Sequence, residues 1–275
     1  MRRGVALGAA ASIAVVVLLA LPVFAFSSTS SRSKEVEGLH AASVSARCAG
    51  NTHVQFGGYQ YQLSYPLDLQ RPTVVATGMR ITASNQLTVD GQGFSPSGKT
   101  SRLTATAYCY PGPAPSKATN TAVIRHQAGG VTATCPAGKV VVAAGFASQA
   151  GTGHGHDVNS IERIAANKLR VTLVAAQQVT ASLTAIAYCR SGPAPTLVSK
   201  SVAIAPGHLA TARAKCPSGS SLAFGGVIAE AHIGNEKRPV IYPVRISADN
   251  TTVWRVSGRN AGLAGGKLTA LAYCR

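Results

Sequence analysis

Short segments in which apolar residues alternate with Ser, Thr and charged residues make up most of this chain. This alternation has a period of two, which predicts β-strands that bury one face and expose the other. Three nearly identical segments each close a stretch of such strands: Leu103–Cys109, Leu183–Cys189 and Leu268–Cys274. About six strands fit into each stretch, and no amphipathic helical period follows the N-terminal segment, so we expect an all-β fold.

A second cysteine precedes each closing segment by roughly 60 residues in a matching context, which marks an internal repeat. These cysteines are Cys48, Cys135 and Cys216. The sequence therefore predicts three copies of one module, at residues 34–110, 117–190 and 200–275. Pro-rich stretches at 111–115 and 191–195 predict short, stiff linkers, and the polar residues 26–33 predict a tether.

The repeats indicate two possible architectures. We favour three tandem homologous disulfide-closed β-sandwich-like modules, because a unit of about 75 residues needs a covalent link to supplement its modest core. The alternative is a single β-prism with pseudo-three-fold symmetry that uses one sheet per repeat. A glycine recurs in the third predicted strand of each repeat, at Gly58, Gly145 and Gly226, and predicts a close backbone approach or a bulge.

The six cysteines all lie in the repeats and predict disulfides formed in an oxidising compartment. Threefold repetition leaves two pairings open. One lies within each repeat: Cys48–Cys109, Cys135–Cys189 and Cys216–Cys274. The other joins neighbouring repeats through Cys109–Cys135 and Cys189–Cys216, and closes with Cys48–Cys274. We favour the first because it makes each module self-contained.

The first 25 residues predict an exported protein. Arg2 and Arg3 precede a long apolar segment that ends in small residues at Val23 and Ala25, as in a cleaved signal peptide. The apolar segment is also long enough to serve as an uncleaved transmembrane anchor. In either case we expect the repeats to lie outside the cytoplasm, secreted or at the cell surface.

The balance of charge is strongly basic. The chain carries 26 Lys and Arg against 9 Asp and Glu, a formal net charge of +17. Such a field attracts anionic polymers or membrane surfaces. Basic residues never run longer than a pair, so we expect no specific nucleic-acid recognition. Anionic polymers of the envelope or matrix are the predicted partners, and membrane contact is expected only through the N-terminal segment if it stays uncleaved.

The run "CPAGKVVVAAGF" from Cys135, together with "LTAIAYC" from Leu183, resembles a repeat of secreted proteins of actinobacteria and related bacteria. That repeat has Cys-Pro-x-Gly, an apolar stretch, a Gly-Gly-Phe-like strand and a closing Ala-Tyr-Cys. The resemblance covers all three repeats, although Ala49 replaces the proline in the first. The family has no established activity, so the resemblance implies location and module type.

The sequence predicts no catalytic centre and no cofactor. "GFSPSG" at Gly93 departs from a nucleophile elbow, and acidic residues do not recur across the repeats. His154, His156 and Asp157 form the most metal-like cluster, but it occurs in one repeat only and three ligands within four residues are cramped. We expect a solvated loop there and no metal site.

Two sets of residues are candidates for binding. Arg80, Arg163 and Arg245 recur once per repeat, and either form a regularly spaced basic stripe or brace the adjacent hairpin. Tyr59, Tyr61 and Tyr65 alternate in the first repeat, and either stack on sugar rings or cover the core. The expected function is therefore non-catalytic binding of anionic polymers at the cell envelope, and the alternative is a glycan-binding module.

Overall fold

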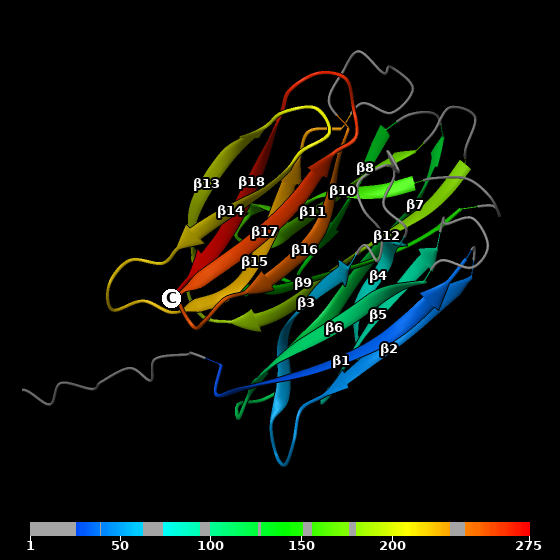
Figure 1. The fold of residues 1–275 in the computed structure, drawn as a ribbon. Coiled ribbons are helices and arrows are strands. Elements are labelled where there is room, and N and C mark those ends of the chain that lie inside the picture. The colour runs from blue at the N-terminus through cyan, green and yellow to red at the C-terminus, as the bar shows by residue number, and fades with distance from the viewer. Residues whose placement is uncertain are drawn as a thin grey trace, which may run out of the picture.

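A computed structural model describes residues 26–38, 40–62, 74–93, 100–125, 128–150, 156–175, 180–231 and 240–275. The predicted signal or anchor segment, residues 1–25, lies outside the described residues. Every regular element among the described residues is a β-strand (Figure 1). Within these ranges, no helix is long and apolar enough to cross a membrane.

Each repeat supplies six strands, as the alternation predicts. The first repeat contains β1 (Ser28–Glu37), β2 (Ala41–Arg47), β3 (His53–Gln62), β4 (Val74–Ala83), β5 (Gln86–Gly93) and β6 (Thr100–Tyr110). The second contains β7 (Ser116–Arg125), β8 (Ala128–Thr134), β9 (Lys139–Ala150), β10 (His156–Ala165), β11 (Lys168–Ala175) and β12 (Thr180–Ser191). The third contains β13 (Thr196–Ile204), β14 (Leu209–Lys215), β15 (Leu222–Ala229), β16 (Ile241–Ala248), β17 (Val253–Asn260) and β18 (Gly266–Cys274).

Within each repeat the six strands divide into two three-stranded halves that face each other. In the first repeat these halves are β1-β6-β3 and β2-β5-β4. The two halves are packed closely enough that a Cβ on Gly57 of β3 would meet the side chain of Leu87 on β5. The fold is therefore all-β and built from three sandwich-like modules, as expected.

The sheets extend beyond the modules. Each of the three six-stranded sheets joins one half of a repeat to one half of its neighbour: β1-β6-β3-β16-β17-β14, β2-β5-β4-β9-β12-β7 and β13-β18-β15-β10-β11-β8 (Figure 1). The third repeat pairs back onto the first, so the arrangement closes with pseudo-three-fold symmetry. This closure matches the prism alternative, but every sheet is shared by two repeats instead of belonging to one.

The junctions between half-sheets are narrow, and we call them seams. Among the described residues, two residue pairs join the strands at each seam. They are Gln60–Arg245 and Tyr59–Ile246 for β3 with β16, Gly78–Ala147 and Met79–Phe146 for β4 with β9, and Ser160–Ile228 and Ile161–Val227 for β10 with β15. With so short a backbone ladder, side-chain contacts must add to the stability of each seam.

The recurring glycine lies at the seam. A Cβ built on Gly58 would lie 2.5 Å from the carbonyl oxygen of Ile246, and one on Gly145 would lie 2.6 Å from that of Met79. A Cβ on Gly226 would likewise meet the carbonyl oxygen of Ile161. The close backbone approach predicted from the sequence is thus confirmed, and it occurs between repeats.

The tyrosine of each Ala-Tyr-Cys motif crosses the same seam. The backbone N–H groups of Ala248, Ile81 and Arg163 donate hydrogen bonds to the hydroxyl oxygens of Tyr108, Tyr188 and Tyr273, at 2.6, 2.6 and 2.8 Å respectively. Each bond joins the last strand of one repeat to the fourth strand of the preceding one in the ring. Burial raises the pKa of each of these tyrosines to about 12.

The disulfides lie within the repeats: Cys48–Cys109, Cys135–Cys189 and Cys216–Cys274. The first cysteine of each pair follows the second strand of its repeat, and the other lies in the sixth strand. These two strands belong to different sheets. The within-repeat pairing is confirmed, and the three bonds together link each sheet to the other two. Their formation indicates an oxidising, extracytoplasmic compartment.

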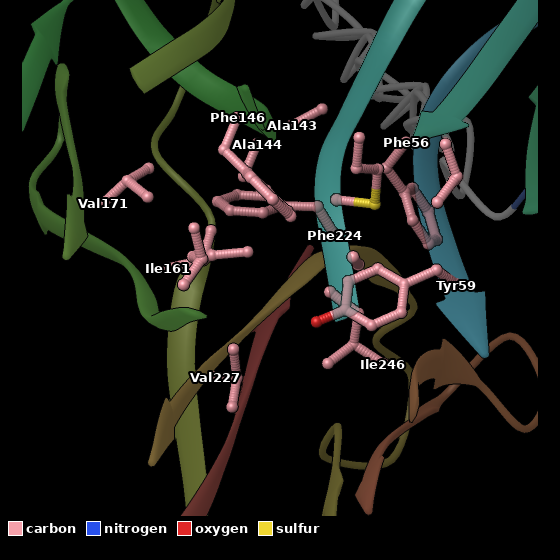
Figure 2. Close-up of a cluster of buried hydrophobic side chains, with 14 of the residues drawn as sticks. Phe56, Tyr59, Ala143, Ala144, Phe146, Ile161, Val171, Phe224, Val227 and Ile246 are labelled. Atoms are coloured by element: carbon pink, nitrogen blue, oxygen red, sulfur yellow. The ribbon is translucent and has the colours of Figure 1, made fainter. Parts of the chain in front are cut away.

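The core is continuous across all three repeats. Phe56, Phe146 and Phe224, from β3, β9 and β15, are at most 2% exposed. Figure 2 shows these rings gathered with Ile161 and Ile246 from the strands across the seams. A core shared in this way buries more apolar surface than separate units of about 75 residues could.

Residues 28–33 are the first part of strand β1 instead of a tether. β1 is an edge strand, and only Val36 of its ten residues is buried. The strand therefore shows no hydrophobic alternation. It is stabilised by backbone pairing with β6 and by hydroxyl hydrogen bonds such as Ser31–Thr106 at 3.0 Å and Ser33–Thr104 at 2.9 Å.

Candidate anion-binding surface

The three arginines that recur in the sequence occupy non-equivalent positions at the seams. The residue whose N–H is bound by the seam tyrosine is Ile81 in the first repeat, Arg163 in the second and Ala248 in the third. Arg80 therefore lies one residue before that position, Arg163 lies at it, and Arg245 lies three residues before it. A regularly spaced stripe of these side chains does not form.

Arg80 lies in a groove beside the seam between β4 and β9. Its guanidinium forms an ion pair with Asp90 on β5, and Asp90 also accepts a hydrogen bond of 2.5 Å from Ser43. The groove has a volume of about 370 Å³, and hydroxyl groups of Ser148 and Thr184 contribute to its wall. Arg80 thus brings a positive charge to a polar, open surface, but that charge is balanced locally.

A second groove lies at the related seam between β3 and β16, and its volume is about 330 Å³. Its lining includes Arg245, Ser247 and the hydroxyls of Ser31, Thr104 and Thr106. Arg245 donates a hydrogen bond of 2.7 Å from Nε to Ser247 Oγ, which restrains its guanidinium at the groove.

Arg245 belongs to a cluster in which three arginines surround one carboxylate. Arg213 Nε lies 3.0 Å from Asp249 Oδ2, whereas Arg255 Nη1 and Arg245 Nη2 lie 3.2 and 3.7 Å from Oδ1. Arg213 and Arg255 are direct cross-strand partners on β14 and β17. Since one negative charge faces three positive charges, this surface keeps an excess charge of +2 beside the groove.

Arg163 lies apart from both grooves. Its Nη2 donates a hydrogen bond of 2.5 Å to the carbonyl oxygen of Pro195 in the second linker, and its guanidinium carbon lies 4.8 Å from the ring centroid of Tyr273. Burial lowers the pKa of Arg163, and the Tyr273 ring acts in the opposite direction. This arginine braces the seam and the linker, whereas the second interpretation of the sequence had it brace the adjacent hairpin.

The tyrosines of β3 lie in the core. Tyr59 and Tyr61 are 3% and 4% exposed, and Tyr59 packs against Phe146 of the second repeat with ring centroids 6.4 Å apart. They therefore cover the core and cannot present a stacking face to a sugar. Tyr65 lies outside the described residues.

Asp157, the only described side chain of the metal-like cluster in the sequence, is buried at 5% exposure. Burial raises its pKa well above the usual range, and its charge contributes to the raised pKa values of Tyr59 and Tyr61. His154 lies outside the described residues. No group of three or more His, Cys, Asp or Glu within the described ranges has metal-site geometry.

Sequence reasoning missed Arg213 and Arg255. Arg213 has no arginine counterpart in the other repeats, and Arg255 has one only in the second repeat, Arg170, so neither position carries an arginine in all three repeats. Only their place in the strand pattern indicates that they are exposed, because each follows a buried residue on an alternating strand and must face outward. Their convergence on Asp249 depends on pairing between β14 and β17, which the sequence alone does not specify.

No protein-family model matches this chain, and no match is found among curated proteins.

Proposed function

We propose that this protein is exported and binds anionic polymers of the cell envelope without catalysing a reaction. The observation that carries the proposal is the cluster of Arg213, Arg245 and Arg255 around a single carboxylate, beside a hydroxyl-lined groove. Guanidinium groups suit phosphate and carboxylate ligands because their N–H donors match oxyanion geometry. Hydroxyl groups along the groove add hydrogen bonds to sugar or polyol units of such a polymer.

The remaining basic residues extend this field over all three sheets. Exposed ones include Arg32 on β1, Arg47 on β2, Lys117 on β7, Arg170 on β11, Lys200 on β13 and Lys267 on β18. A long polyanion can contact several of these at once, so many weak contacts add up through effective concentration. Charge spread in this way favours an extended polymer over a single small anion.

Export is supported by the three disulfides and by the apolar N-terminal segment described from the sequence. Binding, as opposed to catalysis, is supported by the ion pairs that the carboxylates of both grooves form with arginine. Asp90 is paired with Arg80, and Asp249 with three arginines. These ion pairs occupy both carboxylates, so neither is free to act on a bound ligand.

Retention on purified cell-wall polymer across a salt titration tests the proposal. Raising ionic strength from about 0.05 M to about 1 M shortens the screening length to roughly 3 Å, and the protein should be released. The double variant Arg213→Gln/Arg255→Gln should elute at lower salt than a matched variant with the same charge loss, Lys34→Gln/Lys200→Gln.

Two results would contradict the proposal: retention that persists at about 1 M salt, or equal elution of both double variants. A turnover that a single substitution abolishes, found in a broad screen for hydrolase and redox activity, would contradict its non-catalytic part.

A further inference from the structure

The residues that directly follow the second cysteine of each repeat lie near one another in the structure. They are Tyr110 in the first repeat, Arg190 in the second and Arg275 in the third. The guanidinium carbon of Arg190 lies 5.5 Å from the ring centroid of Tyr110. Arg275 is within electrostatic range of Arg190, Arg163 and Tyr110. The second and third repeats therefore contribute positive charges to one cluster, and the first repeat contributes the ring of Tyr110.

The linkers hold these guanidinium groups in place. Arg190 Nη2 donates a hydrogen bond of 2.5 Å to the carbonyl oxygen of Pro113, and Arg275 Nη2 donates one of 3.3 Å to that of Pro193. Arg163 makes the same kind of bond to Pro195. We call Arg163, Arg190 and Arg275 the arginine triad. A guanidinium has five N–H donors, so one bond to a carbonyl fixes its orientation and leaves donors for a ligand.

The positive charges of Arg163 and Arg190 are poorly compensated among the described residues. Burial lowers the pKa of Arg275, and the positive charges of Arg190 and Arg163 lower it further. Arginine nevertheless stays protonated. Within the described ranges, no carboxylate forms an ion pair with Arg163 or Arg190. By contrast, Arg80 and the arginines around Asp249 each have a carboxylate partner.

Part of the triad's hydrogen-bonding capacity is also unused. Arg163 Nη1 and Arg190 Nε are buried, and neither has an acceptor in the part of the chain that the structure describes. A half-buried cation without a counter-charge is costly, because it has lost water without gaining an opposite charge. An anion bound between the arginines would relieve this cost.

We propose that the arginine triad is a binding site for a tetrahedral oxyanion, namely a phosphate group. A planar carboxylate matches the fork of one guanidinium, whereas a tetrahedral phosphate presents oxygens to groups that approach from three directions. The phosphate is either a free ion or an ester within a polymer, since both offer the same oxygens. This goes beyond general attraction to polyanions, because it assigns a defined site that exists whether or not the protein binds a polymer.

Isothermal titration of inorganic phosphate into the whole protein at low ionic strength tests the site. The double variant Arg190→Gln/Arg275→Gln should bind phosphate at least about tenfold more weakly, because each guanidinium contributes charge-assisted hydrogen bonds. The matched control Lys34→Gln/Lys200→Gln loses the same charge at exposed strand positions outside the triad and should bind phosphate like the parent. Acetate, a planar anion of lower charge, should bind at least about tenfold more weakly than phosphate.

Equal weakening in both double variants, or equal binding of acetate and phosphate, would overturn the site. The variant Arg190→Lys/Arg275→Lys keeps the charge and loses the forked donors, so it should bind phosphate with intermediate affinity. If the glutamine variant fails to fold, this lysine variant is compared with the parent instead. Phosphate should also raise the melting temperature of the parent but not of the folded triad variants.

A second titration, with poly(glycerol phosphate), distinguishes the two sources of phosphate. Tighter binding per phosphate than for the inorganic ion, lost in the triad variants, identifies an ester in a polymer. Tighter binding of the inorganic ion identifies free phosphate. If the parent protein binds inorganic phosphate but shows no salt-sensitive retention on polymer, the proposed function is wrong and the arginine triad stands. If the parent is retained on polymer but does not bind inorganic phosphate, the arginine triad is wrong and the proposed function stands.

Discussion

The hydroxyl oxygen of Tyr188 accepts a hydrogen bond of 2.6 Å from the backbone N–H of Ile81, which lies 107 residues earlier in the chain. Tyr188 belongs to the second repeat and Ile81 to the first, so the bond crosses a seam. The ring of Tyr188 also lies over Gly145, where a Cβ would come within 3.2 Å of Tyr188 Cε2. The Ala-Tyr-Cys and Gly motifs of the repeat thus act together to join neighbouring modules.

Replacing Tyr188 with Phe should destabilise the protein by about 1–3 kcal/mol, because the half-buried N–H of Ile81 loses its acceptor. Denaturant unfolding measures the change. Tyr59→Phe is the matched control, since the Tyr59 hydroxyl lies 3.5 Å from the carbonyl oxygen of Pro243 and that bond is too long to be strong. If both variants unfold at the same denaturant concentration as the parent, the seam bond adds no stability.

Replacing Gly145 with Ala should cost about 2 kcal/mol, since the new methyl group would meet the carbonyl oxygen of Met79 and push β9 away from β4. Gly265→Ala is the control, because the nearest atom to a Cβ at that position is 3.9 Å away. Thermal unfolding compares the two. A Gly145→Ala variant as stable as the control would show that the seam yields easily.

Removing one disulfide should weaken the link between two sheets. Cys135→Ser/Cys189→Ser opens a loop with a sequence separation of 54 residues, and the chain-entropy account gives a loss of about 4 kcal/mol. Urea unfolding of this variant, compared with the parent, measures the loss. Peptide mapping of the unreduced parent is the companion experiment, and a peptide linked through Cys109 and Cys135 would contradict the pairing in the structure.

The buried carboxyl of Asp157 should make stability fall as pH rises. Burial raises its pKa in the folded state above the unfolded value of about 3.9. Between those two pKa values the folded state binds more protons, so increasing pH favours unfolding through this group. Asp157→Asn should remove this slope in urea midpoints measured between about pH 4 and pH 8, whereas Glu37→Gln at an exposed position should leave it unchanged. If the stability of Asp157→Asn still falls with pH in the same way, another titratable group causes the pH dependence.

Closure of the three repeats into a ring predicts a compact particle in solution. A globular chain of this length has a radius of gyration of about 18–19 Å. Three modules arranged in a row would give a clearly larger value and an elongated scattering profile. Small-angle scattering on the monomer therefore tests whether the third repeat pairs with the first.

The sequence by itself determined the strands, the repeats and the cysteine partners that could exist. Alternation of small apolar and polar residues specifies strands because side chains on a strand point to opposite faces. The alternation pattern did not predict the strand at residues 28–33, since an edge strand exposed on both faces needs no alternation. The sequence also predicted a close approach at Gly58, Gly145 and Gly226, but not which strand makes it.

Only the tertiary structure decided which half-sheets pair, and this changed the meaning of the candidate residues. Backbone hydrogen bonds are alike for any two strands, so the sequence of one module does not reveal whether its open edge pairs within the module or with a neighbour. Pairing of β14 with β17 inside the third repeat gathers Arg213 and Arg255 around Asp249. Pairing between half-sheets of different repeats buries Tyr59 and Tyr61 and separates Arg80, Arg163 and Arg245. It also brings Arg190 close to Tyr110. The repeated "Cys-Arg" at Cys189 and Cys274 was visible in the sequence, but a charge cluster formed by separate repeats depends on long-range packing.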